Sequence, residues 1–162
     1  MRGEPYRPAF HQAGDFAAGR QAVVSPVNGH KIGAFICYES VFPNFVRQFA
    51  AEGAEVLFNI SNDGWFGQSA ARRQHLLLVR MRAAENRRWI LRSTNDGITA
   101  TIDAAGRLRG TLPLYAQAAS YTGFNYISSQ TFYTRHGDWF AWLCGAMAAA
   151  CLAAAGRTWR RP

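Results

Sequence analysis

The sequence predicts an α/β protein in which helices pack on a sheet and an apolar helix follows at the C-terminus. Between residues 31 and 112, short apolar runs alternate with helix-spaced segments and then with turns, an order typical of α/β domains. Beyond them, 17 residues without a charged side chain precede a cluster of arginines. At 162 residues and 49% hydrophobic content, the chain is about one domain long and too apolar for intrinsic disorder.

Hydrophobic periodicity and turn residues predict each element in order. The apolar spacing after the first strand predicts a helix with Ser40 as its N-cap and Pro43 in its first turn. The strands are expected to be mostly buried beneath the helices. The expected elements are a strand at 31–36, a helix at 41–51, a strand at 55–60, a loop at 61–69, a helix at 70–88, and strands at 89–94, 98–103 and 108–112.

The first 30 residues contain four glycines and three prolines and show no periodicity or signal peptide. A domain rarely begins with so long a stretch without structure, so we expect the chain to be the later part of a longer protein.

The charge balance favours an anionic partner. The formal charge is +8, from 18 basic and 10 acidic residues, and Lys31 is the only lysine. Nucleic acid and anionic lipid headgroups both fit this charge, but the sequence lacks an RNP, KH or zinc-finger pattern, so we expect no nucleic-acid partner. Six arginines lie between residues 72 and 88; they predict a solvated helix face, partly paired with Glu85 or Asp96, or a contact with lipid headgroups.

Residues 139–155 predict a membrane-spanning helix. Their length corresponds to about 26 Å, close to the thickness of the hydrocarbon core of a bilayer. The arginines at 157, 160 and 161 would place the C-terminus in the cytoplasm. The alternative is a buried helix of a soluble protein, because the segment is short and rich in alanine. Cys144 and Cys151 lie seven residues apart on one face of this helix, which favours helix packing over metal binding.

Cys37 is the sharpest candidate for chemistry. It follows a predicted strand and precedes a helix, which is where α/β sheets present reactive groups. The alternative is an inert buried cysteine. A second loop, 59–67, contains Trp65 and Phe66 between glycines and is expected at the same sheet edge. These two aromatic side chains either line a hydrophobic opening to the site or pack inward. His75 is interpreted as a structural, hydrogen-bonding histidine within the long helix.

Three motifs in order carry a family resemblance: ICYES at 36–40, NISNDGWFG at 59–67, and QHLLLVRMRAAENRRWILRSTNDGITATID at 74–103. From about Gly14 to the C-terminus, including TRHGDW at 134–139, the sequence resembles the apolipoprotein N-acyltransferases, membrane enzymes with a nitrilase-superfamily domain. The resemblance implies part of a nitrilase-like αββα sandwich at 1–137, a transmembrane helix at 138–156 and a basic cytoplasmic tail at 157–162. It also implies the bacterial inner membrane, with the domain on the periplasmic side.

The resemblance implies roles for seven residues and no metal or cofactor. Cys37 would be the nucleophile that takes an acyl chain from a phospholipid as a thioester and passes it to the α-amino group of an apolipoprotein's diacylglyceryl-cysteine. Tyr38 would donate its backbone N–H to the oxyanion, and Glu39 would be an accessory acid. The residues implied in substrate binding are Asn62, Asp63, Trp65 and Phe66.

The sequence departs from the family upstream of the nucleophile. The family's general-base glutamate and catalytic lysine precede Cys37, on segments that this chain mostly lacks. Lys31 lies on the same strand, about 20 Å from Cys37, too far to contact an oxyanion; Glu4 resembles a family loop glutamate only weakly. We therefore expect this chain alone to be inactive. The alternatives are a carbon–nitrogen hydrolase acting on an amide or nitrile, and a membrane-anchored fragment without catalysis.

Overall fold

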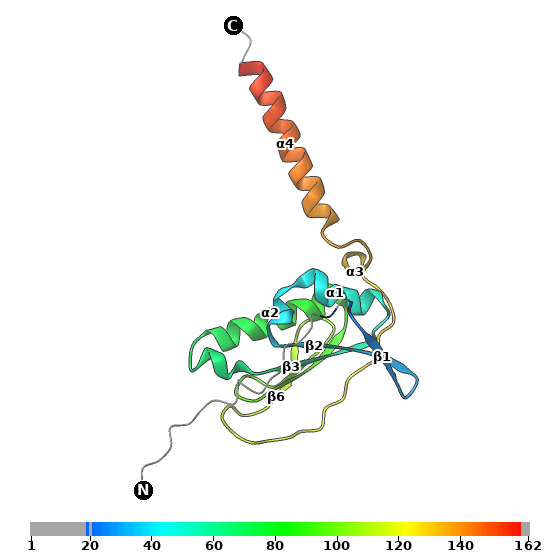
Figure 1. Ribbon diagram of the computed structural model, residues 1–162, viewed down its shortest axis with the longest axis vertical. Coiled ribbons are helices and arrows are strands. Elements are labelled where there is room, and N and C mark those ends of the chain that lie inside the picture. The colour runs from blue at the N-terminus through cyan, green and yellow to red at the C-terminus, as the bar shows by residue number, and fades with distance from the viewer. Residues whose placement is uncertain (1–18, 20, 160–162) are drawn as a thin grey trace.

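The computed structural model describes residue 19 and residues 21–159, and its centre is one mixed sheet with helices on one face (Figure 1). The sheet order follows the chain, β1-β2-β3-β4-β5-β6. The central pairs β2–β3 and β3–β4 are parallel, and the outer pairs are antiparallel. The strands are β1 Val24–Val27, β2 His30–Ile36, β3 Val56–Ser61, β4 Trp89–Thr94, β5 Ala100–Ile102 and β6 Leu108–Thr111.

The connections between the parallel strands contain helices, because parallel neighbours need a long crossover connection. The helices are α1 Pro43–Ala51, α2 Ala71–Asn86, α3 Phe132–His136 and α4 Trp139–Trp159, with short 3₁₀ helices η2 Cys37–Val41 and η3 Asp63–Phe66. Alternate strand residues such as Phe35, Leu57 and Ile90 pack against α1 and α2 and form the hydrophobic core. Gly33 allows α1 to approach β2, because a Cβ there would lie 2.9 Å from Phe49 Cβ.

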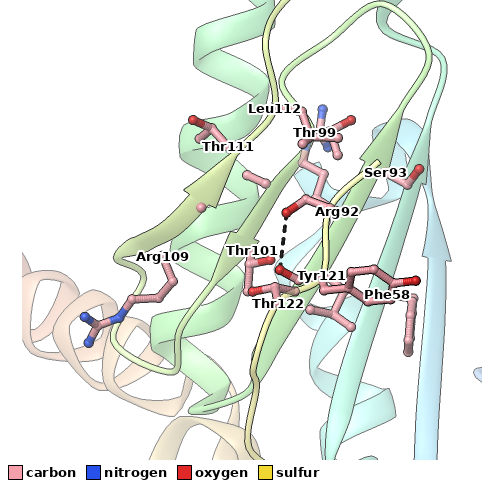
Figure 2. A pocket seen from close by; sticks show the side chains of 14 residues that line it. Phe58, Arg92, Ser93, Thr99, Thr101, Arg109, Thr111, Leu112, Tyr121 and Thr122 are labelled. Carbon is pink, nitrogen blue, oxygen red and sulfur yellow. Dashed lines mark hydrogen bonds between the residues drawn. The ribbon is translucent and has the colours of Figure 1, made fainter. Parts of the chain in front are cut away.

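The opposite face of the sheet is only partly covered, which corrects the expectation of a mostly buried sheet. Ile36 is 64% exposed and Ile60 58% exposed. Residues 112–131 pass along this side of the sheet (Figure 1). Between that segment and the sheet lies an open pocket of about 400 Å³, whose lining includes Phe58, Tyr121 and Thr122 (Figure 2). The lining of this pocket does not include Cys37, and we assign it no catalytic role.

The 112–131 segment is fixed to the sheet by buried and stacked side chains. The Arg88 guanidinium is fully buried and donates to the carbonyl oxygens of Ala54 and Ser129, at 2.5 and 2.6 Å. Tyr126 stacks on His30 with ring centroids 3.5 Å apart. These contacts hold the segment as it runs back across the sheet to α3.

Most element predictions are confirmed to within a few residues, and β4 matches at both ends. Two predictions are wrong. β1 lies within the N-terminal stretch that was expected to be unstructured, and it pairs with β2 across the Asn28-Gly29 turn. Ser40 does not cap α1, because a 3₁₀ turn intervenes and Phe42 occupies the N-cap position.

The arginines of α2 and its C-terminal turn are not one solvated face. Arg73 and Arg87 are exposed, whereas the side chains of Arg72, Arg82 and Arg88 are buried. The predicted pairs do form: Arg82 lies 2.7 Å from Glu85, and Arg72 lies 3.6 Å from Asp96.

α4 extends away from the rest of the domain as a single long helix (Figure 1). The residues before it are held by α1, since Asn44 donates to the Asp138 carboxylate at 2.7 Å and Arg47 donates to the Thr134 carbonyl in α3 at 2.8 Å. Within the described part of the chain, it is the one helix long and apolar enough to cross a membrane, and none of its residues 139–156 is buried. Glu4 and the arginines at 160 and 161 lie outside the described residues.

Candidate active site

The candidate site lies at one edge of the sheet, where the three parallel strands end. Cys37 follows β2, Asp63 lies two residues beyond β3, and Asn95 follows β4. Because parallel strands present their carboxyl ends at the same edge, these positions are brought together by topology alone. The Asp63 backbone N–H donates to the Asn95 side chain at 3.2 Å.

Cys37 occupies a sharp turn between β2 and η2. Its φ is +48°, in the left-handed region that a side chain with a Cβ occupies at a cost of about 1–2 kcal/mol. Two contacts hold this turn from either side. The Glu39 carboxylate accepts from the Ile36 backbone N–H at 2.6 Å, and His75 Nε2 lies 3.1 Å from the Cys37 carbonyl oxygen. The Cys37 side chain itself is partly exposed.

Tyr38 follows Cys37 in the first turn of η2. Backbone N–H groups in the first turn of a helix have no acceptor within that helix, so the Tyr38 N–H is free of intrahelical bonding. The Tyr38 side chain is 56% exposed and meets Phe42 edge to face, with ring centroids 6.2 Å apart. Glu39 has a defined structural contact, the bond to the Ile36 N–H described above.

Beneath Cys37, a chain of buried polar side chains links η2, η3, α2, β3 and β4. Ser40 Oγ lies 2.8 Å from His75 Nε2, and His75 Nδ1 lies 3.0 Å from an Asp63 carboxylate oxygen. The other Asp63 oxygen accepts from Arg92 at 2.6 Å, and Arg92 also bonds to Asn59. Asn59 and Arg92 are direct cross-strand partners, which explains their contact.

The charges of this network depend on one another. Burial raises the pKa of Asp63, but hydrogen bonds from His75 and Ser61 and the positive charge of Arg92 outweigh it and lower that pKa to about 2. Burial lowers the pKa of Arg92, and the charges of Asp63 and Cys37 oppose that effect. Breaking a buried pair of this kind leaves an uncompensated charge, so we expect the network to be sensitive to removal of either partner.

The aromatic loop lies beside the same histidine. Trp65 is 71% exposed, and Phe66 packs edge-on against the His75 ring with centroids 5.5 Å apart. The Asn62 side chain accepts from the Gly64 N–H at 3.1 Å and from Asn95 at 2.7 Å, which holds the loop against the end of β4.

The structure thus gathers Cys37, Tyr38 and Phe66 around His75. Glu39 contacts the Ile36 N–H, and Trp65 lies beside Phe66 in η3. Asp63 needs a correction. Its residue is fully buried and both carboxylate oxygens are engaged by neighbours, so we place it in the buried network and not on a substrate-binding surface. Lys31 lies near the opposite end of β2 from Cys37, as expected.

Sequence reasoning missed Asn59 and Arg92, and it gave His75 and Ser40 no link to Cys37. One signal was available, since Arg92 lies two residues after Ile90 in a β-strand pattern and therefore shares its buried face. In the part of the chain that the structure describes, no group of three or more histidine, cysteine or acidic side chains is placed to hold a metal ion.

Together, this fold and site define an α/β protein with a cysteine at a strained turn after a central parallel strand. The chain belongs to the carbon–nitrogen hydrolase family, whose family model matches residues 4–127. It is 40% identical over 144 residues to the apolipoprotein N-acyltransferase of Geobacter metallireducens, covering 89% of this chain and 28% of that protein. It is also 40% identical to the apolipoprotein N-acyltransferase of Azotobacter vinelandii, over 83% of this chain and 25% of the relative. The chain therefore spans only about a quarter of the length of these curated relatives.

Solved structures confirm a nitrilase-like fold. Nit3 of Saccharomyces cerevisiae, a nitrilase-superfamily member, aligns with a TM-score of 0.53 and 21% identity, over 64% of this chain and 41% of that one. The CN-hydrolase superfamily protein XC1258 of Xanthomonas campestris aligns with a TM-score of 0.52 and 24% identity, over 63% of this chain and 43% of its own.

Proposed function

We propose that this chain is the nucleophile-bearing, C-terminal part of an apolipoprotein N-acyltransferase. The observation that carries the proposal is the position of Cys37, at a strained turn on the carboxyl edge of the parallel strands, directly above a buried polar network. The similarity to relatives of this name over 89% of the chain supports the same assignment.

The proposed reaction consists of two acyl transfers through a thioester. The Cys37 thiolate attacks an ester carbonyl of a phospholipid, a C–S bond forms, and the C–O bond to the lipid breaks, so that a lysophospholipid leaves with a proton. The α-amino group of the diacylglyceryl-cysteine of an apolipoprotein then attacks the thioester. A C–N bond forms, the C–S bond breaks, and the thiol is regenerated with the amine's proton. Proton transfer would be carried out by residues beyond this chain's described part.

Each site residue has a role in this proposal. The Tyr38 backbone N–H would stabilise the negative oxygen of the tetrahedral intermediate. Glu39 would hold the turn through its contact with the Ile36 N–H. Trp65 and Phe66, with Asn62 holding their loop, would cover the acyl chain and shield the thioester from water.

The proposed setting is the bacterial inner membrane, with residues 138–156 spanning it and 1–137 on the periplasmic side. The exposed length of α4 supports this, because 18 helical residues extend about 27 Å, close to the hydrocarbon thickness of a bilayer. The exposed α4 also favours an acyltransferase over an amidase of the same superfamily, since a soluble amidase does not need an exposed apolar helix.

The test is Cys37→Ala in the full-length protein that the proposal implies. Incubated with phospholipid, the wild type should gain the mass of one acyl chain in intact-protein mass spectrometry, and the variant should gain none. Cys144→Ser and Cys151→Ser are matched controls, since both cysteines lie on the exposed α4, and each should acylate like the wild type. Acylation of the Cys37→Ala variant at the wild-type rate would exclude Cys37 as the nucleophile.

A further inference from the structure

His75 touches the nucleophile's backbone and not only its own helix neighbours. Its residue is 3% exposed, and Nε2 lies between the Cys37 carbonyl oxygen, at 3.1 Å, and Ser40 Oγ, at 2.8 Å. The opposite nitrogen, Nδ1, lies 3.0 Å from Asp63. Asp63 is held in turn by Ser61 at 2.6 Å and by Arg92 at 2.6 Å, so the orientation of the imidazole ring is set from three elements.

The peptide group that His75 contacts is the one that carries the proposed oxyanion donor. The Cys37 carbonyl and the Tyr38 N–H belong to a single peptide unit, which is planar and trans, so the two groups point in opposite directions. A side chain that fixes the carbonyl on the buried side therefore also fixes where the N–H points on the open side. This control matters at Cys37, because its left-handed φ of +48° persists only when surrounding contacts enforce it.

We propose that His75 is a positioning residue for acyl transfer: its Nε2 holds the Cys37 carbonyl and thereby aims the Tyr38 N–H at the oxyanion. This inference rests on the proposed function, and it adds a residue whose effect reaches the reaction through the backbone. A purely structural histidine would tie α2 to the sheet edge through Asp63 without any effect on the oxyanion.

Two variants separate these roles, because each places an amide at the position of only one of the two imidazole nitrogens. The His75→Asn amide lies near the place of Nδ1 and can keep the Asp63 contact, whereas the His75→Gln amide reaches the place of Nε2 and can donate to the Cys37 carbonyl. Positioning through Nε2 predicts that glutamine substitutes for histidine and asparagine does not. A structural tie through Asp63 predicts the reverse order.

The experiment measures two reactions of Cys37 in this chain, purified in detergent with Cys144 and Cys151 changed to serine. The first is acylation by a p-nitrophenyl ester, in which thiolate attack forms a C–S bond through an oxyanion and p-nitrophenolate leaves without a proton. The second is alkylation by iodoacetamide, a displacement at carbon that forms no oxyanion. Cys37→Ala supplies the blank for both.

We expect His75→Asn to lower the acylation rate about 10-fold, part of the 10²–10³-fold cost of losing an oxyanion donor, and to leave alkylation at the wild-type rate. His75→Gln should keep most of the acylation rate. Equal acylation by the two variants, or a parallel loss of acylation and alkylation, would overturn the positioning role and leave the proposed function standing. A wild-type acylation rate no higher than that of Cys37→Ala would instead overturn both.

Discussion

At the scale of single residues, Asp63 shows how a buried charge makes the site depend on pH. Its carboxylate lies between His75 and Arg92 and is out of contact with solvent. Because the pKa of Asp63 is lowered from 3.8 to about 2 in the folded protein, the charged form stabilises the fold. That stabilisation is complete above the unfolded pKa and disappears as the pH falls toward the folded one.

The corresponding prediction is that Asp63→Asn costs about 2 kcal/mol of unfolding free energy near neutral pH, the value of the pKa shift. The difference from the wild type should shrink between about pH 5 and pH 2. Urea unfolding followed by circular dichroism across this range measures it. Asp96→Asn is the control, because the side chain of Asp96 is half exposed and lies 3.6 Å from Arg72, a geometry worth little. A pH-independent difference for Asp63→Asn would contradict the assignment.

At the scale of elements, the packing of α1 on β2 places the Cys37 turn, because η2 and α1 follow directly from β2. The contact is close at Gly33, where an added Cβ would lie 2.9 Å from both Phe49 Cβ and Leu57 Cδ2. A shift of α1 away from the sheet would also carry Phe42 and the end of η2 with it.

Gly33→Ala should therefore destabilise the protein by about 1–3 kcal/mol through overpacking. Chemical unfolding gives the value. Gly110→Ala is the matched control in another strand, since nothing lies within 4 Å of its added Cβ, and it should be neutral or slightly stabilising. Similar destabilisation by both variants would point to backbone conformation and not to the α1–β2 contact.

The membrane proposal for α4 makes a topological prediction. In cells, a reporter fused after Pro162 that works only in the cytoplasm should be active, and one that works only after export should be silent, because the arginines at the C-terminus favour the cytoplasmic side. The reverse pattern, or a protein that stays in solution without detergent, would remove the membrane span and favour a soluble amidase.

The elements were largely predictable from the sequence, and the polar network was not. Short apolar runs bounded by turn residues locate β2, β3 and β4, and helical spacing locates α2, because these elements form the buried centre of the domain. β1 escaped detection because it is short, contains Pro26 and is mostly exposed, so its two valines form no alternating pattern. Asp63 was expected on a binding surface because the family resemblance implied it. Its burial depends on Arg92, 29 residues away, and only the register of β3 with β4 brings the two strands together.

At the scale of the whole molecule, the chain presents a half-covered sheet. α1 and α2 bury one face, whereas Ile36 and Ile60 remain more than half exposed on the other. Large apolar side chains exposed next to each other can mark a surface that another part of a protein covers. This arrangement agrees with a chain that spans about a quarter of the length of its relatives.

We predict that this chain alone has no N-acyltransferase activity from phospholipid. Unlike an activated aryl ester, a phospholipid leaving group must be protonated, and directed proton transfer is typically worth about 10²–10⁴-fold in rate. The assay combines the purified chain in detergent with phospholipid and a diacylglyceryl-cysteine peptide, and mass spectrometry looks for N-acylated peptide. Turnover equal to that of a complete relative would show that the proton-transfer groups lie within these 162 residues.

The junction between α1 and α4 has a mechanical consequence. Asn44 bonds to Asp138, the residue directly before α4, and Arg47 bonds to the Thr134 carbonyl in α3. α1 in turn begins two residues after the 3₁₀ turn that starts with Cys37. With α4 embedded in a bilayer, this short linkage would fix the distance between the lipid and the Cys37 thiol. The height of Cys37 above the acyl chains would then be set by where α4 settles, so bilayer thickness and helix tilt would tune how often a donor ester comes within reach.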